Sequence, residues 1–305
     1  RVMTTCIDVS NLSKRYGDIH AVSDLSFSVE QGEIFGLLGP NGAGKTTTLE
    51  MLAGIRRASS GQVAIMGHDP YRDRKFTVEH VALQQQESSV FQYLTVSELV
   101  ELHASFYSDP RKPDDAIEFA GLLDHRGQRF SKLSGGQKRR LAFSLAVVGN
   151  TDILILDEPA AGLDPAARTE LQVSIRRLQS LGKTIVYTTH HLEEATELCD
   201  RVAIMVDGRM RIAGSPGALI NQFDSTANID FTMLDPGQGE SARAWCETHA
   251  LVEQSRLSPG GIVTVTTEDS DSFIRSLHSS DLRFKNLRIR AGSLNDVYTS
   301  LVRGE

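Results

Sequence analysis

The sequence predicts an α/β fold with a second, smaller α+β domain, and three observations support this prediction. Two continuous apolar runs, Ile153–Leu156 and Thr184–Tyr187, flank a helix-like segment, which is the pattern of parallel strands buried on both faces. A glycine-rich loop at 39–44 lies between a short apolar strand and a helix. The composition then changes late in the chain. We therefore expect one domain at 1–222 and an accessory domain at 223–305.

Composition narrows the function classes. The chain has 305 residues, 40% of them hydrophobic and 23% charged, which is ordinary for a soluble globular protein. The longest apolar stretches, such as Leu141–Val148, are far shorter than the ~18 residues of a transmembrane helix, and residues 1–10 lack the pattern of a signal peptide. The net charge of −7 disfavours nucleic acid as a partner, because phosphate contacts require Lys and Arg. The widely spaced Cys6, Cys199 and Cys246 indicate buried thiols in a reducing cytosol.

The first part of the chain predicts strands around the glycine-rich loop. Apolar and polar residues alternate over 6–9 and again over 21–29, with a Tyr-Gly-Asp turn between them, so we expect two antiparallel strands. The next segments are predicted as strand 33–38, helix 46–55 and strand 61–66.

Helical spacing then begins near residue 95 and continues to 148. We expect helices that begin near Val96 and include 117–123 and 139–148, followed by helix 166–181 between the two apolar strands and a last strand at 201–206. The accessory domain is predicted as strand 228–233, helix 241–250, strand 261–267, helix 272–279, strand 287–289 and helix 294–302. Short β-α-β units of this length suggest a ferredoxin-like α+β domain.

The stretch 39–46 matches the phosphate-binding pattern G-x-x-x-x-G-K-[ST]. Its glycines let successive N–H groups point at phosphate oxygens, and the helix that follows adds its positive dipole end. Lys45 is expected to reach the β and γ phosphates, and the Thr46 hydroxyl to bind Mg²⁺. A strand before and a helix after favour a RecA-like P-loop NTPase core over a chance glycine-rich turn. The expected ATP-contacting residues are Gly39, Pro40, Asn41, Gly42, Ala43, Gly44, Lys45, Thr46 and Thr47.

Two acids, Asp157 and Glu158, end the apolar strand that begins at Ile153. Adjacent strand residues point to opposite sides, so the two carboxylates can serve different ligands. We expect Asp157 to hold Mg²⁺, usually through water, and Glu158 to act as general base on the attacking water. The alternative, a pair of acids that cap the turn before Pro159, is less favoured beside a P-loop.

Residues 133–137 read LSGGQ and precede a basic run, 138–140, and an apolar helix. Physically, the motif supplies a second helix N-terminus that phosphate can approach closely. The motif follows a P-loop and comes shortly before the Asp157-Glu158 pair. With its motifs in this order, the segment from residue 1 to about 222 resembles the nucleotide-binding subunit of an ABC transporter. The resemblance implies that two chains, in a homodimer or a heterodimer of related subunits, sandwich two ATP molecules. The residues implied to contact the partner's ATP are Ser134, Gly135, Gly136 and Gln137.

The resemblance also implies roles for an aromatic residue and a glutamine. Tyr16 is implied to stack on adenine, with ordinary strand packing as the alternative. Gln86 is implied to contact Mg²⁺ and the attacking water. Three consecutive glutamines, Gln84–Gln86, leave this register open by one or two residues.

Two further positions match the family near the second apolar strand. Asp164 matches the loop that crosses the dimer interface. His190 matches the histidine that senses the γ phosphate, and no role is assigned to His191. One departure is Ala160, where the family commonly has Thr or Ser after Asp-Glu-Pro. This change removes a hydroxyl but no ligand, so we expect activity to survive.

Within the family, the chain resembles bacterial exporters of drugs, lipids or polysaccharides, especially the daunorubicin-resistance type. The segments 188–195, 198–202 and 292–298 are similar to that branch. The resemblance implies an integral-membrane permease on a separate chain, docked near 87–107. It also implies a peripheral location on the cytoplasmic face of the membrane, where ATP hydrolysis drives export.

Two alternatives stay open at this point. One is an importer, which only the branch resemblance and the tail disfavour. The other is a soluble ABC-type ATPase that acts as a regulator or nucleic-acid remodeller without a permease. A single P-loop and the lack of a sustained heptad pattern disfavour that second class.

Overall fold

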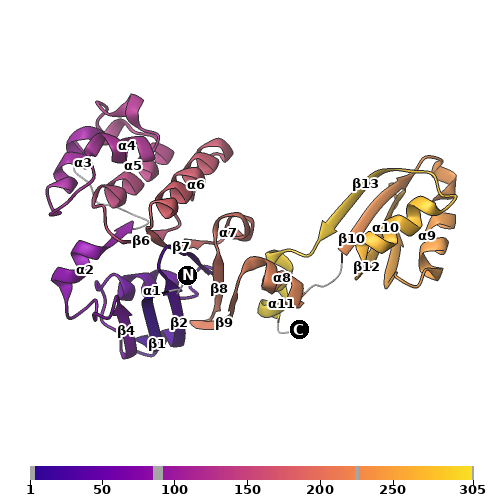
Figure 1. Cartoon of the computed structure of the whole chain (residues 1–305), viewed down its shortest axis with the longest axis horizontal. Coiled ribbons are helices and arrows are strands. Elements are labelled where there is room, and N and C mark those ends of the chain that lie inside the picture. The colour runs from indigo at the N-terminus through magenta and orange to yellow at the C-terminus, as the bar shows by residue number, and fades with distance from the viewer. Residues whose placement is uncertain (1–3, 85–91, 224–226, 304–305) are drawn as a thin grey trace. The chain divides into compact units, whose positions relative to one another are not determined.

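The computed structural model describes residues 4–84, 92–223 and 227–303 (Figure 1). The chain divides into two compact units, Arg1–Pro216 and Gly217–Glu305. The predicted domain boundary between 222 and 223 lies within helix α8 (Pro216–Phe223). The bounds 1–222 and 223–305, as limits of two independently folding domains, stay a prediction.

A mostly parallel sheet forms the centre of the first unit, in the order β5-β6-β7-β3-β8-β9. Its strands β3, β6 and β7 are buried along their whole length, as continuous apolar sequences require. The last strand, β9, was not predicted; it pairs antiparallel with β8 at the sheet edge and alternates between exposed and half-buried residues. The bounds are β3 Ile34–Leu38, β5 Val81–Gln84, β6 Ile153–Asp157, β7 Thr184–Thr189, β8 Arg201–Val206 and β9 Arg209–Gly214.

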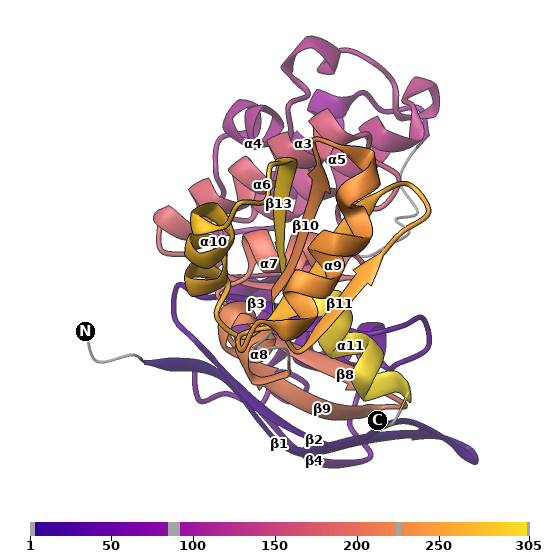
Figure 2. The same cartoon turned by 90° about the vertical axis from the view of Figure 1, so that its right-hand side faces the viewer.

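A second sheet, in the order β2-β1-β4, is formed by β1 (Thr5–Tyr16), β2 (Ile19–Glu30) and β4 (Ser60–Ile65) (Figure 2). The predicted antiparallel pairing of the first two strands is confirmed. One hydrophobic core joins this sheet to the central one, and within it the rings of Phe27 and Phe35 stack at 5.1 Å. The helix α1 (Lys45–Leu52) buries Leu49 and Leu52 in the same core.

Helices α3, α4 and α5 gather into a separate layer of the first unit (Figure 1). The predicted helix at 117–123 was wrong in its bounds: α4 begins at Pro113, which suits a first helical position, and Gly121 in a left-handed conformation ends the segment. The helices of this unit are α2 Arg74–His80, α3 Val96–Ala104, α4 Pro113–Phe119, α5 Gly135–Val148, α6 Pro165–Ser180 and α7 Leu192–Leu198.

The second unit has the β-α-β-β-α-β order of a ferredoxin-like fold, with the sheet order β11-β12-β10-β13. The predicted α+β architecture is confirmed. Strand β11 was missed because its sequence, QSRL, is short and lacks an apolar pattern. The bounds are β10 Ala227–Met233, α9 Gly239–Thr248, β11 Gln254–Leu257, β12 Ile262–Thr267, α10 Ser270–Ser279, β13 Phe284–Ala291 and α11 Leu294–Arg303.

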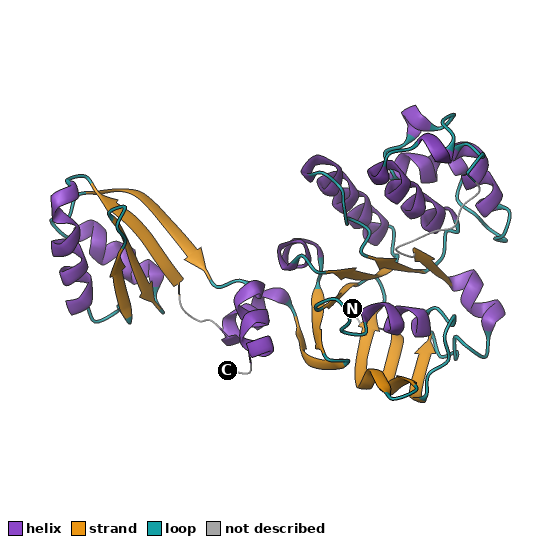
Figure 3. Ribbon diagram, turned by 180° about the vertical axis from the view of Figure 1, so that it is seen from behind, coloured by secondary structure: helices purple, strands orange, loops and turns teal. Residues whose placement is uncertain are grey.

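Helices α9 and α10 cover one face of this sheet (Figure 3). Alternate residues of β10, including Ile229 and Phe231, are buried against them, while the residues between are half-exposed. The single tryptophan, Trp245, packs on this core 6.2 Å from the ring of Phe273. Its fluorescence therefore reports the folding of the second unit.

We expect Phe231→Ala to lower the free energy of unfolding of the second unit by about 3–5 kcal/mol, because truncation of a fully buried ring leaves a cavity. Denaturant unfolding of the full chain, followed by Trp245 fluorescence, measures this change. Thr232→Ala, at the next position on the half-exposed face, is the matched control and should shift the midpoint little. Equal midpoints for Phe231→Ala and the wild type would contradict this packing.

Candidate functional site

The sheet topology places the predicted chemistry at one edge. Strands β3, β6 and β7 are adjacent and parallel, so their carboxyl ends meet. The glycine-rich loop follows β3, Asp157 ends β6, and His190 follows β7. Ligands of open α/β sheets bind outside this edge. Segments separated by more than a hundred residues in sequence are thereby brought to one site.

The loop needs glycine at two positions for steric reasons. Gly39 and Gly44 have φ angles of 152° and 94°. A Cβ at Gly39 would stand 2.3 Å from the carbonyl oxygen of Met205, and one at Gly44 would stand 2.3 Å from that of Ala21. Neither position tolerates a side chain, so the tight path of the loop depends on both glycines.

Lys45 is buried at the start of α1, and its side chain contacts the backbone of the loop. Its Nζ donates to the carbonyl oxygens of Gly39 at 2.8 Å and Pro40 at 3.1 Å. Burial lowers the pKa of the ammonium group, while the charges of Glu158 and Asp157 act in the opposite direction. The ammonium borders a cavity of about 350 Å³ lined by Ala21, Asn41, Gly42, Gly44, Lys45, Thr46, Thr47 and Glu158.

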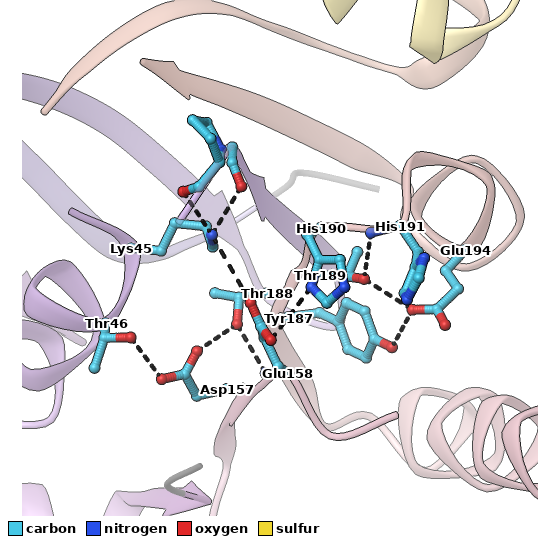
Figure 4. A network of polar contacts seen from close by, with 12 residues as sticks. Lys45, Thr46, Asp157, Glu158, Tyr187, Thr188, Thr189, His190, His191 and Glu194 are labelled. Carbon is cyan, nitrogen blue, oxygen red and sulfur yellow. Dashed lines mark hydrogen bonds and ion pairs between the residues drawn. The ribbon is translucent and has the colours of Figure 1, made fainter. Parts of the chain in front are cut away.

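Asp157 joins the loop to the sheet. One of its carboxylate oxygens accepts a hydrogen bond from the Thr46 hydroxyl at 2.9 Å, and the other accepts from Thr188 at 2.6 Å (Figure 4). Thr46 and Asp157, two of the three residues predicted to contact Mg²⁺, therefore lie together. Among the described residues no group of three or more His, Cys, Asp or Glu forms a metal cluster. A hydroxyl and one carboxylate suit Mg²⁺, which is usually held by one or two carboxylates together with substrate phosphates.

Glu158 is held in an unusual backbone conformation, with φ at 46°. Such a conformation costs about 1–3 kcal/mol for a residue with a side chain. The Thr188 hydroxyl accepts the Glu158 N–H at 2.9 Å and so helps to fix it. The buried carboxylate lies 3.9 Å from Lys45 Nζ and 3.3 Å from His190 Nδ1. The strained backbone conformation thus places this carboxylate between the lysine and the histidine.

Thr188 was not predicted as a site residue, although it precedes His190 in the Thr-Thr-His-His stretch. We expect Thr188→Val to lower the free energy of unfolding by about 1–3 kcal/mol, because the Asp157 oxygen and the Glu158 N–H each lose a partner. The ATP turnover that the family resemblance implies should fall more than ATP affinity. Steady-state kinetics and thermal unfolding measure both effects. The exposed Thr169→Val is the control, and identical kinetics for the two variants would contradict the bridging role.

The two histidines at the end of β7 differ in their contacts. The His190 ring faces Glu158, whereas the backbone N–H of His191 donates to Thr189 Oγ1 at 2.9 Å. Their rings lie 4.2 Å apart. The geometry therefore brings His190, the predicted residue, to the site and leaves the His191 ring exposed beside it.

Other predicted residues are not among those that line the cavity. Tyr16 is 39% exposed at the end of β1, with the charged groups of Arg56 and Lys14 about 5 Å from its ring centre. Asp164 caps α6 by accepting the Ala167 N–H at 3.0 Å. Gln86 lies outside the described residues.

The LSGGQ stretch forms the N-terminus of α5, also away from the cavity lining. Ser134 and Gln137 form a reciprocal capping box: Ser134 Oγ accepts the Gln137 N–H, and Gln137 Oε1 accepts the Ser134 N–H. Ser134 and Gly135 are exposed. This helix end is therefore presented to solvent, where a group from outside the chain can reach it.

Comparison with known proteins places the chain in a family. The family model described as "ABC transporter" matches residues 22–161. "Nod factor export ATP-binding protein I" of Burkholderia orbicola is 41% identical over 304 residues, covering 98% of this chain and 97% of the relative. The protein of the same name from Rhizobium etli is 37% identical over 79% of this chain and 78% of its own length.

The chain belongs to the ABC transporter family.

Solved structures agree with the architecture of an ABC transporter ATPase. The ATP-binding subunit of an ABC transporter is 26% identical, with a TM-score of 0.66 over 72% of this chain and 93% of that one. A bacterial ABC transporter cassette solved as a dimer is 25% identical, with a TM-score of 0.64 over 68% of this chain and 98% of that one. The predicted P-loop NTPase fold is confirmed, and the chain is an ATP-binding ATPase subunit of the ABC exporter type. Within the described residues, this ABC subunit has no helix long and apolar enough to cross a bilayer.

Proposed function

We propose that this subunit hydrolyses Mg-ATP between two copies and thereby drives export through a separate permease. The observation that carries the proposal is the connected set of Thr46, Asp157, Thr188, Glu158 and His190 beside the buried Lys45 (Figure 4). A hydroxyl, two differently placed carboxylates, a cation and an imidazole are the parts that phosphoryl transfer to water requires.

ATP binds through charge and backbone geometry. The loop at 39–44 directs N–H groups toward the phosphates, and Lys45 exchanges its carbonyl contacts for phosphate oxygens. Thr46 and Asp157 would hold Mg²⁺, which would neutralise phosphate charge when bound. Gln86 is proposed as a further ligand on the family resemblance alone.

Water attack is assigned to Glu158 and His190. Glu158 accepts the proton of the attacking water, since its carboxylate is held at the cavity wall by the constrained backbone. His190, on the other side of that carboxylate, positions the γ phosphate and the water. Both groups come from fixed strand ends, so the geometry exists before ATP arrives.

A second copy completes the site. The exposed N-terminus of α5 at Ser134 and the exposed Asp164 cap do not line the cavity of their own chain. Helix N-termini bind phosphate well, so Ser134, Gly135, Gly136 and Gln137 are assigned to the ATP held by the partner, with Asp164 at the interface. ATP binding then closes the dimer and hydrolysis reopens it. Tyr16, at the surface, is assigned to the adenine.

A membrane permease is the proposed partner, with the subunit bound peripherally on the cytoplasmic face. In the described part of the predicted docking region, Tyr93 and Phe106 are 82% and 64% exposed. Exposed aromatic side chains of this kind are typical of interaction surfaces. The names of the similar proteins favour a cargo of the Nod factor type, selected by the permease.

Purification from detergent-solubilised membranes tests this function. The wild-type chain should be recovered with an integral-membrane protein, and its ATPase activity should change when that protein is present. Tyr93→Asp should reduce recovery without loss of folding, because the ring is exposed. Recovery without any membrane protein, together with salt-sensitive binding to DNA or RNA, would instead favour a regulator or remodeller.

A further inference from the structure

Glu194 is a buried carboxylate outside the ATP cavity. It lies on α7, four residues after His190, with 5% of its side chain exposed. Its neighbour Glu193, on the same short helix, is exposed. A buried carboxylate is stable only when charges and hydrogen bonds compensate its lost hydration. The partners of Glu194 therefore show which segments it holds together.

Two of these partners lie at the end of β7. One Glu194 oxygen accepts hydrogen bonds from Thr189 Oγ1 at 2.9 Å and from Tyr187 Oη at 3.1 Å (Figure 4). Burial, reinforced by the Glu194 charge, raises the pKa of Tyr187 well above its usual value, so this phenol stays a donor. Thr189 in turn accepts the backbone N–H of His191. The carboxylate thus secures the residues on both sides of His190.

The third partner comes from a different element. The other Glu194 oxygen lies 2.9 Å from Arg168 Nε. Arg168 stands one turn into α6, and its backbone N–H donates to the Asp164 carbonyl oxygen at 3.0 Å. One ion pair, between the partly exposed Arg168 and the buried Glu194, therefore connects the helix capped by Asp164 to the turn that carries His190.

We propose that Glu194 is a positioning residue for ATP hydrolysis, which holds His190 beside Glu158 and couples it through Arg168 to the Asp164 turn. The inference rests on the proposed function of His190 and Asp164. Because Asp164 is assigned to the dimer interface and His190 to the γ phosphate, the ion pair transmits closure of the interface to the residue beside the attacking water. Removal of the Glu194 charge weakens the ion pair with Arg168 but leaves the P-loop unchanged.

Glu194→Gln is the first test, since it keeps the side-chain volume and an acceptor oxygen but removes the charge. We expect kcat to fall about tenfold or more, because small displacements of positioning groups cost up to about 100-fold. The Kd for ATP, measured by nucleotide titration, should stay within about twofold. Glu193→Gln makes the same chemical change one residue away on the exposed side and should leave both quantities unchanged.

Thr189→Val is the second test and carries no risk from a buried charge, because it removes one hydroxyl at nearly constant volume. It should lower kcat with unchanged ATP affinity, and the double variant with Glu194→Gln should lose less than the product of the two single effects. Equal turnover for Glu194→Gln and Glu193→Gln would overturn the inference. So would parallel losses of turnover, ATP affinity and thermal stability, which indicate a merely structural role. Mg-ATP turnover by the wild type tests the proposed function separately.

Discussion

Glu158→Gln is expected to bind Mg-ATP with nearly wild-type affinity and to lose about 100-fold or more in turnover. The amide keeps the shape of the side chain but cannot accept the proton of the attacking water, and general bases contribute factors of about 10² to 10⁴. The backbone at residue 158 should stay in its left-handed conformation, because the Thr188 hydroxyl still accepts its N–H. With hydrolysis blocked, the variant should accumulate as an ATP-bound closed dimer.

Two measurements check this expectation. Steady-state phosphate release gives the turnover, and size-exclusion chromatography with and without ATP gives the oligomeric state. Glu197→Gln, on the exposed side of α7, is the matched control and should behave as the wild type. Normal turnover in Glu158→Gln would show that Glu158 is not the general base, whatever oligomeric state the variant adopts.

Lys45→Ala is expected to weaken ATP binding by about 100-fold or more. The ammonium group is buried among the loop carbonyls, the Glu158 carboxylate and the cavity. It lines the cavity in which the phosphates are proposed to bind, and charge-assisted contacts are worth about 1.5–3 kcal/mol each. Several such contacts are lost together in the variant.

Titration with a fluorescent ATP analogue measures this loss. Lys75→Ala, an exposed lysine on α2, removes the same charge away from the cavity and should leave affinity unchanged. An unaltered Kd in Lys45→Ala would show that the loop holds nucleotide by its backbone alone. Thermal unfolding of both variants shows whether the fold is retained.

The residues that meet at the centre of the candidate site could be picked out from sequence because strand ends and loops are local features. Lys45 and Thr46 follow from the glycine pattern, while Asp157 and Glu158 follow from acids at the end of an apolar strand. Parallel pairing of β3, β6 and β7 then places these residues at neighbouring strand ends, so no other contact is needed to bring them together. His190 was placed by the family resemblance, and the structure brings its ring to Glu158.

The remaining features depend on tertiary contacts that no local pattern contains. Thr188 bridges Asp157 and the Glu158 backbone, which is visible only when β6 and β7 pair. Glu194 looks in sequence like its neighbour Glu193, yet only one of the two is buried. The strained φ of Glu158 has no sequence signal either, because glutamate rarely adopts it.

A mixing experiment tests the central claim, that each ATP is shared by the Lys45 loop of one copy and the Ser134 helix of another. Lys45→Ala and Ser134→Arg each disable one half of the shared site and should be inactive alone. Mixed dimers of the two variants contain one site in which both halves are intact. Random mixing should therefore restore up to about a quarter of wild-type turnover, since about half of the dimers are mixed and each has one working site of two.

The measurement is phosphate release as a function of the ratio of the two variants. The account predicts no activity at either end and a maximum at equal amounts. Turnover that stays at zero at every ratio, from two folded variants that exchange subunits, would contradict the shared site. High turnover by Ser134→Arg alone would contradict it equally.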